Sequence, residues 1–145
     1  MRCEVFKSDA VLRFFRGQPV ATMEELKATL GTSVDMTVFR KLREVGYFSS
    51  YSHRGKFYTT AGVARFDKRG LWSCRGARFS AQGSLIDTAE YFVVNSSTGY
   101  FASELASELG VEVKDPLVSL VRQRRLAREK VAARYLYCCP DPVSR

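Results

Sequence analysis

The sequence is poor in the residues that build most metal sites and catalytic sites. Its only histidine is His53, and its four cysteines, Cys3, Cys74, Cys138 and Cys139, form no C-x-x-C pair. Zinc sites usually draw on closely spaced ligand pairs, so we expect no metal site. The motifs G-x-S-x-G, G-x-x-x-x-G-K-[ST] and H-E-x-x-H are also missing. The sequence therefore predicts no enzymatic activity, no cofactor and no small-molecule substrate.

Long apolar runs are missing as well. No stretch of about 18 apolar residues occurs, so no membrane-spanning segment is expected. The first ten residues contain acids and no apolar centre, which is unlike a secretory signal. We interpret all four cysteines as reduced thiols, with the neighbours Cys138 and Cys139 on opposite faces of a strand. These features predict a cytoplasmic protein.

Positive charge, in contrast, is abundant and unevenly distributed. The 145 residues include 23 Lys and Arg against 15 Asp and Glu, a net charge of +8. Residues 1–75 hold 14 basic and 7 acidic side chains, whereas residues 76–145 hold 9 and 8. The apolar fraction of 46% is that of a globular protein. Concentrated basic charge on a folded chain indicates a polyanionic partner.

The most informative stretch runs from residue 22 to residue 60, where the pattern predicts two helices and a hairpin. Thr22 is followed three residues later by Glu25, which is the spacing of a capping box at a helix start. Gly31 is placed to end that first helix in the left-handed conformation. Ser33 or Asp35 could cap the second helix.

The second helix is expected to continue to about Gly46 and to be amphipathic. One face carries the apolar side chains Val38, Phe39, Leu42 and Val45, and we predict an outward face of Thr37, Arg40, Lys41 and Glu44. Two β-prone runs, YFSSY and KFYTT, follow it. They are joined by Ser52-His53-Arg54-Gly55, which is typical of a hairpin turn.

This order of two helices and a basic-tipped hairpin resembles the winged helix-turn-helix family. The resemblance implies an α+β fold in which a small three-helix bundle carries a β-hairpin wing. It also implies that the helix over residues 34–45 enters the major groove of DNA, while the wing lies on the backbone or in the minor groove.

Helix caps and composition predict the structure of the segments on either side of residues 22–60. Residues 1–6 are expected to be a short arm or strand, Ser8 and Asp9 to cap a helix that ends at Gly17, and residues 19–21 to be an extended link. Residues 65–83 are rich in Gly, Arg and Ser, and we predict a basic linker there. Trp72 and Phe79 could dock this linker to a core, or its cations could follow a phosphate backbone.

The second half repeats the first. Residues 25–31 align with residues 104–110 at an offset of 79, and residues 42–48 align with residues 120–126 at an offset of 78. We therefore expect two tandem winged-helix domains of similar size. The expected boundaries are residues 1–64 for domain 1, 65–83 for the linker, 84–139 for domain 2 and 140–145 for a C-terminal tail. Domains this small are marginal alone, so a homodimer is possible.

The resemblance assigns DNA contacts to specific residues. The candidates are Ser33, Met36, Thr37, Arg40, Lys41 and Arg43 around the second helix, His53, Arg54 and Lys56 on the wing, Arg69 and Arg75 in the linker, and Arg122, Arg124, Arg125 and Lys130 in the second copy. Arg and Lys can bond to guanine, and Thr to a base or a phosphate. The first copy is expected to read bases, whereas the second could clamp the backbone or dock a protein.

Three functions follow from these features. The leading one is sequence-specific binding to double-stranded DNA, by a transcriptional regulator or a mobile-element accessory protein associated with the nucleoid. The alternative is a tandem winged-helix adaptor that binds a protein in a chromosome- or nucleic-acid-associated complex, although such adaptors tend to be acidic. Structured RNA is a third partner, but the helix fits the DNA major groove better than the deep, narrow groove of A-form RNA.

Overall fold

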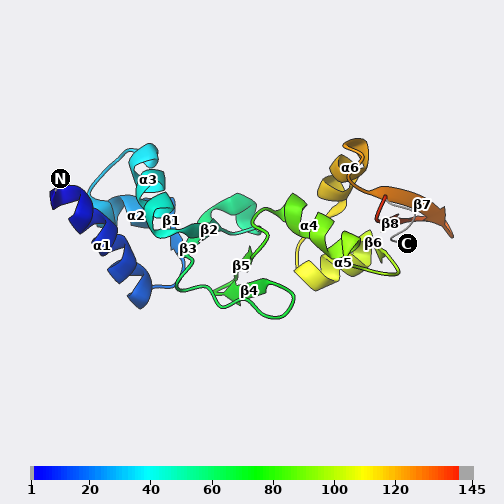
Figure 1. Cartoon of the computed structure of the whole chain (residues 1–145), viewed down its shortest axis with the longest axis horizontal. Coiled ribbons are helices and arrows are strands. Elements are labelled where there is room, and N and C mark those ends of the chain that lie inside the picture. The colour runs from blue at the N-terminus through cyan, green and yellow to red at the C-terminus, as the bar shows by residue number, and fades with distance from the viewer. Residues whose placement is uncertain (1, 141–145) are drawn as a thin grey trace. The chain divides into compact units, whose positions relative to one another are not determined.

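A computed structural model of the chain describes the backbone of residues 2–140 and the side chains of residues 10–140. The chain divides into two compact units, Met1–Gly83 and Ser84–Arg145. Both combine helices with small antiparallel sheets, so the α+β class expected from the sequence is confirmed (Figure 1). The expected C-terminal tail lies outside the described residues except for Pro140.

The first unit contains three helices and two small sheets. The helices are α1 (Arg2–Gly17), α2 (Met23–Leu30) and α3 (Asp35–Val45). The first sheet has the order β1-β3-β2, formed by β1 (Ala21–Thr22), β2 (Tyr47–Ser49) and β3 (Phe57–Thr60), with the short 3-10 turn η1 (His53–Gly55) between β2 and β3. The second sheet pairs β4 (Leu71–Cys74) with β5 (Ala77–Ser80).

The ends of α2 follow the sequence signals. The Thr22 hydroxyl accepts from the Glu25 amide at 3.3 Å, and the Thr22 amide donates to the Glu25 carboxylate at 2.9 Å, which completes the predicted capping box. Gly31 ends the helix at φ 69°. The cap expected for α3 is wrong, because neither Ser33 nor Asp35 caps it. Its N-cap is Val34, which has no side-chain acceptor.

The first helix is longer than the sequence indicated. It begins at Arg2, so residues 2–6 are helical and not an arm or strand, and Ser8 and Asp9 lie inside the helix. No glycine or proline occurs between residues 2 and 16 to interrupt a helix, so the helix runs through Ser8 and Asp9 and does not start there. The core of the unit joins α1, α2 and α3 to β3, with the buried side chains Val11, Phe15, Leu26, Leu30, Val38, Leu42 and Tyr58.

The predicted linker over residues 65–83 is instead a folded hairpin of the first unit. Strands β4 and β5 pair in register from Leu71↔Ser80 to Cys74↔Ala77. Phe79 and Ala77 are fully buried and pack with Val20 in a second small core, which Trp72 and the partly buried Phe48, Phe57 and Phe66 also join. Apolar packing therefore holds this basic segment, as the docking alternative for Trp72 and Phe79 anticipated.

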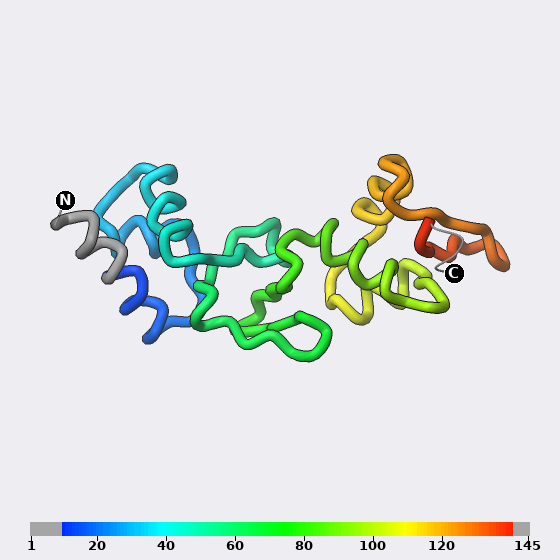
Figure 2. The backbone as a smooth tube through the Cα atoms, viewed as in Figure 1, coloured from blue at the N-terminus to red at the C-terminus, as the bar shows by residue number. Residues whose placement is uncertain are grey.

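The second unit repeats the three helices and the three-stranded sheet of the first in the same order, without a counterpart of the β4–β5 hairpin among its described residues. Figure 2 traces the backbone of both units. Its helices are α4 (Leu85–Val94), α5 (Ala102–Leu109) and α6 (Lys114–Arg122). Its sheet has the order β6-β8-β7, formed by β6 (Tyr100–Phe101), β7 (Ala127–Val131) and β8 (Arg134–Cys138). The Ser84 hydroxyl caps α4 by accepting from the Asp87 amide at 3.2 Å, and Gly110 ends α5 at φ 72°.

Strand pairing follows the same register in the two units. Ala21 pairs with Tyr58 in the first unit, and Tyr100 pairs with Tyr137 in the second, so both partners are displaced by 79 residues. The helix ends Gly31 and Gly110 show the same displacement. The internal repeat seen in the sequence is thus also a repeat of strand pairing.

Candidate nucleic-acid interface

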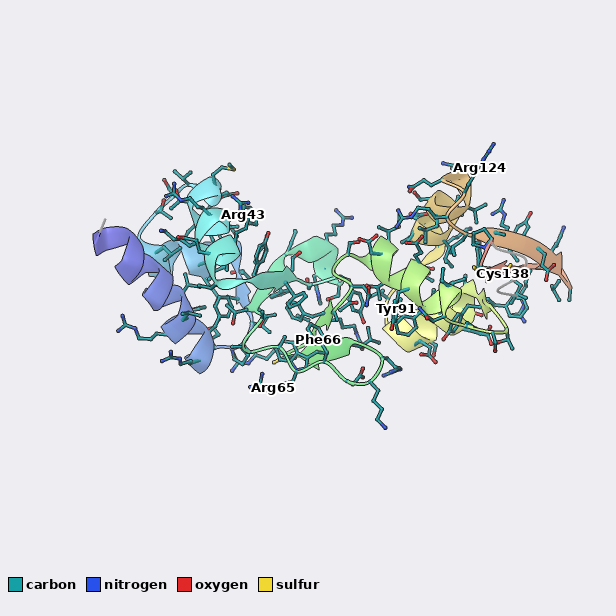
Figure 3. All side chains as sticks on the ribbon, in the orientation of Figure 1. Arg43, Arg65, Phe66, Tyr91, Arg124 and Cys138 are labelled. Carbon is teal, nitrogen blue, oxygen red and sulfur yellow. The ribbon has the colours of Figure 1, made fainter. Side chains whose placement is uncertain are left out.

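Helix α3 presents basic and apolar side chains on its exposed side. Arg40 and Arg43 are both exposed, and Met36 near the helix start is 69% exposed. Figure 3 shows Arg43 on α3. Val34, the N-cap residue, is exposed as well. Ser33 is exposed and Thr37 is half-buried. The exposed side therefore offers two guanidinium groups, and its N-terminal end carries Val34, Met36 and the acidic Asp35.

Lys41 does not belong to this exposed side, so the expected outward face is wrong at that position. Its side chain is fully buried, and its Nζ lies 3.3 Å from an Oε2 atom of Glu44. Counted from the N-cap residues Val34 and Val113, the seventh residue is Lys41 in α3 and Leu120 in α6, and both are buried. Lys41 thus occupies a core position.

The turn between α2 and α3 is held by an ion pair. The Lys27 Nζ lies 2.5 Å from an Oδ1 atom of Asp35, the first residue of α3. This bond raises the pKa of the Lys27 ammonium. The Thr32 hydroxyl also accepts from the Val34 amide at 3.1 Å. Both interactions fix the start of α3 relative to α2, so the exposed side of α3 is presented in one orientation.

The β2–β3 tip, which we define as residues 50–56, carries three more candidate residues. His53, Arg54 and Lys56 are all exposed. His53 and Arg54 have φ values of 53° and 55°, and Gly55 follows at 73°. Such left-handed positions are costly for residues other than glycine. The tip therefore needs support from its surroundings.

The β4–β5 hairpin gives that support, which sequence reasoning missed. The Tyr51 amide donates to the Arg78 carbonyl at 2.8 Å, and the Arg78 amide donates to the Ser52 hydroxyl at 2.9 Å. The buried Ser50 hydroxyl donates to the Ser52 carbonyl at 2.7 Å. The signal available in the sequence was the polar pair Ser50 and Ser52 next to a turn, which is typical of side-chain support for a backbone.

The two candidates in residues 65–83 lie in turns. Arg69 pairs with Asp67, with 3.4 Å between Nη2 and Oδ2, and Asp67 also accepts from the backbone amides of Leu71 and Arg69. The amides lower the pKa of Asp67. Arg75 is exposed in the β4–β5 turn at φ 52°. Arg69 therefore stabilises a loop, whereas Arg75 projects from a hairpin end.

In the second unit, Arg125 is held by acids of α4. Its Nη2 lies 2.6 Å from Glu90 and 3.0 Å from Asp87, and these bonds raise the pKa of the guanidinium. The expectation that Arg125 faces DNA therefore conflicts with its position, because it ties the end of α6 to α4. Arg122, Arg124 and Lys130 are exposed, and Figure 3 shows Arg124 beyond the end of α6.

When the charges are counted by structural unit, the difference in net charge between the two halves becomes larger. Residues 1–83 contain 15 Lys and Arg against 7 Asp and Glu, whereas residues 84–145 contain 8 of each. The whole net charge of +8 therefore belongs to the first unit. This is the unit with exposed cations on both α3 and the β2–β3 tip.

The described part of the chain shows no metal-binding cluster, disulfide or membrane-spanning helix. No group of three or more His, Cys, Asp or Glu side chains there could hold a metal ion. Cys74, Cys138 and Cys139 form no disulfide among the described residues. No helix between residues 2 and 140 has the length and apolar character needed to cross a membrane.

Comparisons with known proteins add no family assignment. No protein-family model matches the chain, and no curated protein matches it.

Proposed function

We propose that this chain binds double-stranded DNA through two tandem winged-helix units, and that the first unit reads sequence. In this proposal α3 enters the major groove and the β2–β3 tip lies on the phosphate backbone. The observation that carries it is the placement of exposed cations on both elements of the one unit that holds the whole net charge.

The exposed basic and apolar residues of α3, its N-cap and the β2–β3 tip each have a chemical role in the proposed complex. Arg40 and Arg43 donate to guanine O6 and N7, which is the commonest specific contact in the major groove. Met36 and Val34 give apolar contacts to thymine methyl groups at the helix start. Arg54 and Lys56 on the β2–β3 tip contact phosphates, which fixes register without reading bases.

A salt titration tests the proposal. Binding of the full chain to mixed-sequence duplex DNA is measured by fluorescence anisotropy at several salt concentrations. Contacts with about six phosphates predict a log–log slope near −5, at roughly −0.9 per phosphate. Absence of binding at low salt would reject DNA binding. A slope near zero would reject the backbone contacts.

The second unit supports a second proposal, that it binds a protein partner. Its charges balance, and Tyr91 and Val94 on α4 are both exposed apolar side chains. A neutral surface with exposed apolar groups is more typical of a protein contact than of a DNA contact. In this version, the chain is an adaptor that the first unit anchors to nucleic acid. Changing Tyr91 and Val94 to Ser would then leave duplex affinity unchanged while abolishing partner binding.

A further inference from the structure

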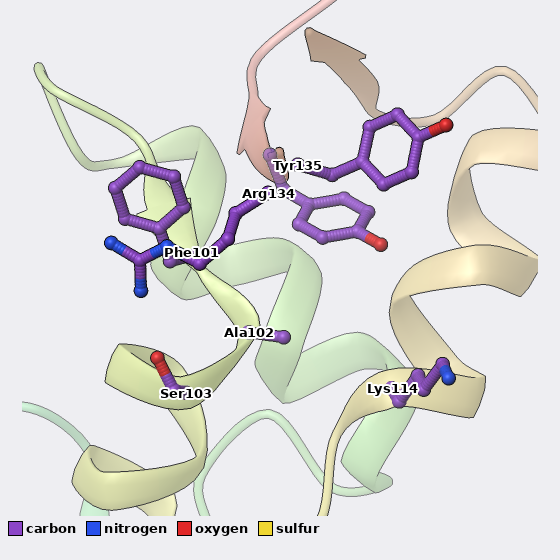
Figure 4. A pocket seen from close by; sticks show the side chains of 7 residues that line it. Phe101, Ala102, Ser103, Lys114, Arg134 and Tyr135 are labelled. Atoms are coloured by element: carbon purple, nitrogen blue, oxygen red, sulfur yellow. The ribbon is translucent and has the colours of Figure 1, made fainter. Parts of the chain in front are cut away.

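An open pocket of about 360 Å3 lies in the second unit, where the starts of α5 and α6 meet β8. Its aromatic lining comes from Phe101, Tyr135 and Tyr137, and its polar lining from Ser103, Lys114 and Arg134 (Figure 4). None of the lining side chains is acidic. This volume lies at the lower end of the range of small-molecule sites.

The cations lie on two sides of the aromatic groups. The guanidinium of Arg134 lies over the Phe101 ring, 4.1 Å from its centroid. Figure 4 shows Lys114 on α6, across the pocket from Arg134 and Phe101. Arg128 lies over the Tyr135 ring at 4.1 Å. The pocket therefore combines flat apolar walls with positive charge from two separate elements.

Tyr137 supplies a hydrogen-bond donor to the pocket. The residue is only 4% exposed and lines the pocket, but its hydroxyl is not among the fully buried side-chain atoms of the described residues that lack a partner, so water reaches it. An anionic group in the pocket would accept the hydrogen bond that this hydroxyl otherwise gives to water.

The first unit shows that the shared fold alone does not produce this pocket. At the positions displaced by 79 residues, Glu24 replaces Ser103 and Asp35 replaces Lys114. Tyr58, which corresponds to Tyr137, packs against the rings of Phe39 and Tyr47 at centroid distances of 5.8 and 6.2 Å. Two of the polar lining positions of the pocket therefore carry acidic side chains in the first unit.

We propose that this pocket binds a small, flat aromatic molecule that carries an anionic group. The aromatic ring packs against Tyr135, Tyr137 and Phe101. The anionic group accepts from the Tyr137 hydroxyl, and Lys114 and Arg134, on opposite sides of the pocket, attract it electrostatically. A nucleotide and an aromatic carboxylate share this chemistry. The inference does not depend on DNA binding by the first unit.

The test titrates the full-length protein, without DNA, with deoxyadenylate and with naphthoate in separate arms. Backbone amide NMR shifts and calorimetry report the binding. At least one ligand is expected to saturate below about 10 mM, with shifts at residues 101–103 and 134–137. Inorganic phosphate is expected to bind at least about tenfold more weakly, because it has no ring.

Three variants locate the site. Lys114→Gln combined with Arg134→Gln should weaken binding about tenfold to hundredfold, because charged hydrogen bonds are lost. Tyr137→Phe keeps the ring and should weaken binding about fivefold to tenfold. Arg122→Gln removes an exposed cation of the same unit outside the pocket and should change affinity less than about twofold.

Several results would overturn the inference. These are no saturation by either aromatic anion, equal affinity for inorganic phosphate, or no effect of the double variant. Because Lys114 and Arg134 are exposed, the double variant should fold normally, which a thermal melt checks. A deoxyadenylate-only result assigns a nucleotide site, and a naphthoate-only result assigns an aromatic carboxylate site.

Discussion

Lys41 is a charged residue at a position that the fold uses for an apolar side chain. Residues 38, 41, 42 and 45 follow the spacing of one helical face, so helical periodicity alone places Lys41 inside. The prediction of an outward Lys41 followed its residue type and not this spacing. The Lys41 side chain is buried, and its ion pair with the partly exposed Glu44 compensates the charge.

Lys41→Leu is therefore expected to stabilise the protein by about 1 kcal/mol, because it removes a buried charge and restores the residue found at the same position of α6. Urea denaturation measures the change. Duplex affinity should remain within about twofold. Arg40→Leu is the matched control, with little effect on stability and a clear loss of duplex affinity. The account is contradicted if Lys41→Leu folds normally but does not bind DNA.

Arg124 occupies a left-handed position that glycine would fill more easily. Its φ is 61°, and Gly46, which aligns with it at an offset of 78, has φ 80°. Arg124→Gly should stabilise the protein by about 1 kcal/mol relative to Arg124→Ala, because only glycine avoids the steric cost. Denaturation midpoints of the two variants give the comparison. Equal midpoints would show that the backbone is not strained there.

For individual helices and strands, the sequence predicted the structure well wherever interactions between neighbouring residues determine it. The capping box at Thr22, the left-handed Gly31 and the hairpin after α3 all follow from short-range chemistry. Strands β4 and β5 were missed because their sequence is dominated by Arg, Gly and Ser. Their pairing depends on packing of Phe79 and Ala77 against Val20, a contact distant in sequence.

The capping box predicts a specific acid sensitivity. The Thr22 amide and the Gln18 side chain lower the pKa of Glu25, so the folded pKa lies below the unfolded pKa. Its contribution to stability is present above about pH 4.3, the ordinary Glu value, and is lost as the pH falls through the folded pKa.

Glu25→Gln should therefore reduce the free energy of unfolding by about 0.5–1 kcal/mol at neutral pH, and this loss should shrink as the pH falls through the folded pKa of Glu25. Chemical denaturation at neutral pH and at acidic pH measures this difference. Glu24→Gln, a neighbouring exposed acid outside the box, is the control and should show a smaller dependence. The same loss for both variants at both pH values would mean that the box is not the cause.

The hairpin support of the β2–β3 tip makes another element-scale prediction. Ser52→Ala removes the acceptor for the Arg78 amide without changing any charge. We expect a loss of about 1 kcal/mol in stability and weaker duplex binding with an unchanged salt slope, because the same phosphates are met by a less ordered tip. Ser73→Ala, at an exposed position of β4, is the control. An unchanged duplex affinity in Ser52→Ala would show that the hydrogen bonds supporting the β2–β3 tip do not contribute to DNA binding.

For the whole molecule, the sequence was enough to predict the repeat, but the distribution of charge between the two units depends on the structure. The repeat could be predicted because glycines and helix caps recur at a nearly constant offset. The second unit begins at Ser84, where the sequence placed the start of domain 2. The inclusion of residues 65–83 in the first unit was not predicted, and this inclusion assigns the whole net charge to the first unit. Arg125 shows the same limit, since its acidic partners Asp87 and Glu90 lie more than 30 residues away in sequence.

The most direct test of the account is a comparison of two double variants on a selected duplex and on a random duplex. Arg40→Ala with Arg43→Ala should reduce the ratio of the two affinities, because these residues read bases. Arg54→Ala with Lys56→Ala should weaken both duplexes about equally, because these residues contact phosphates. Arg16→Ala with Lys68→Ala removes two exposed cations elsewhere in the same unit and is the control. If the ratio of affinities is the same for all three double variants, α3 does not read DNA sequence.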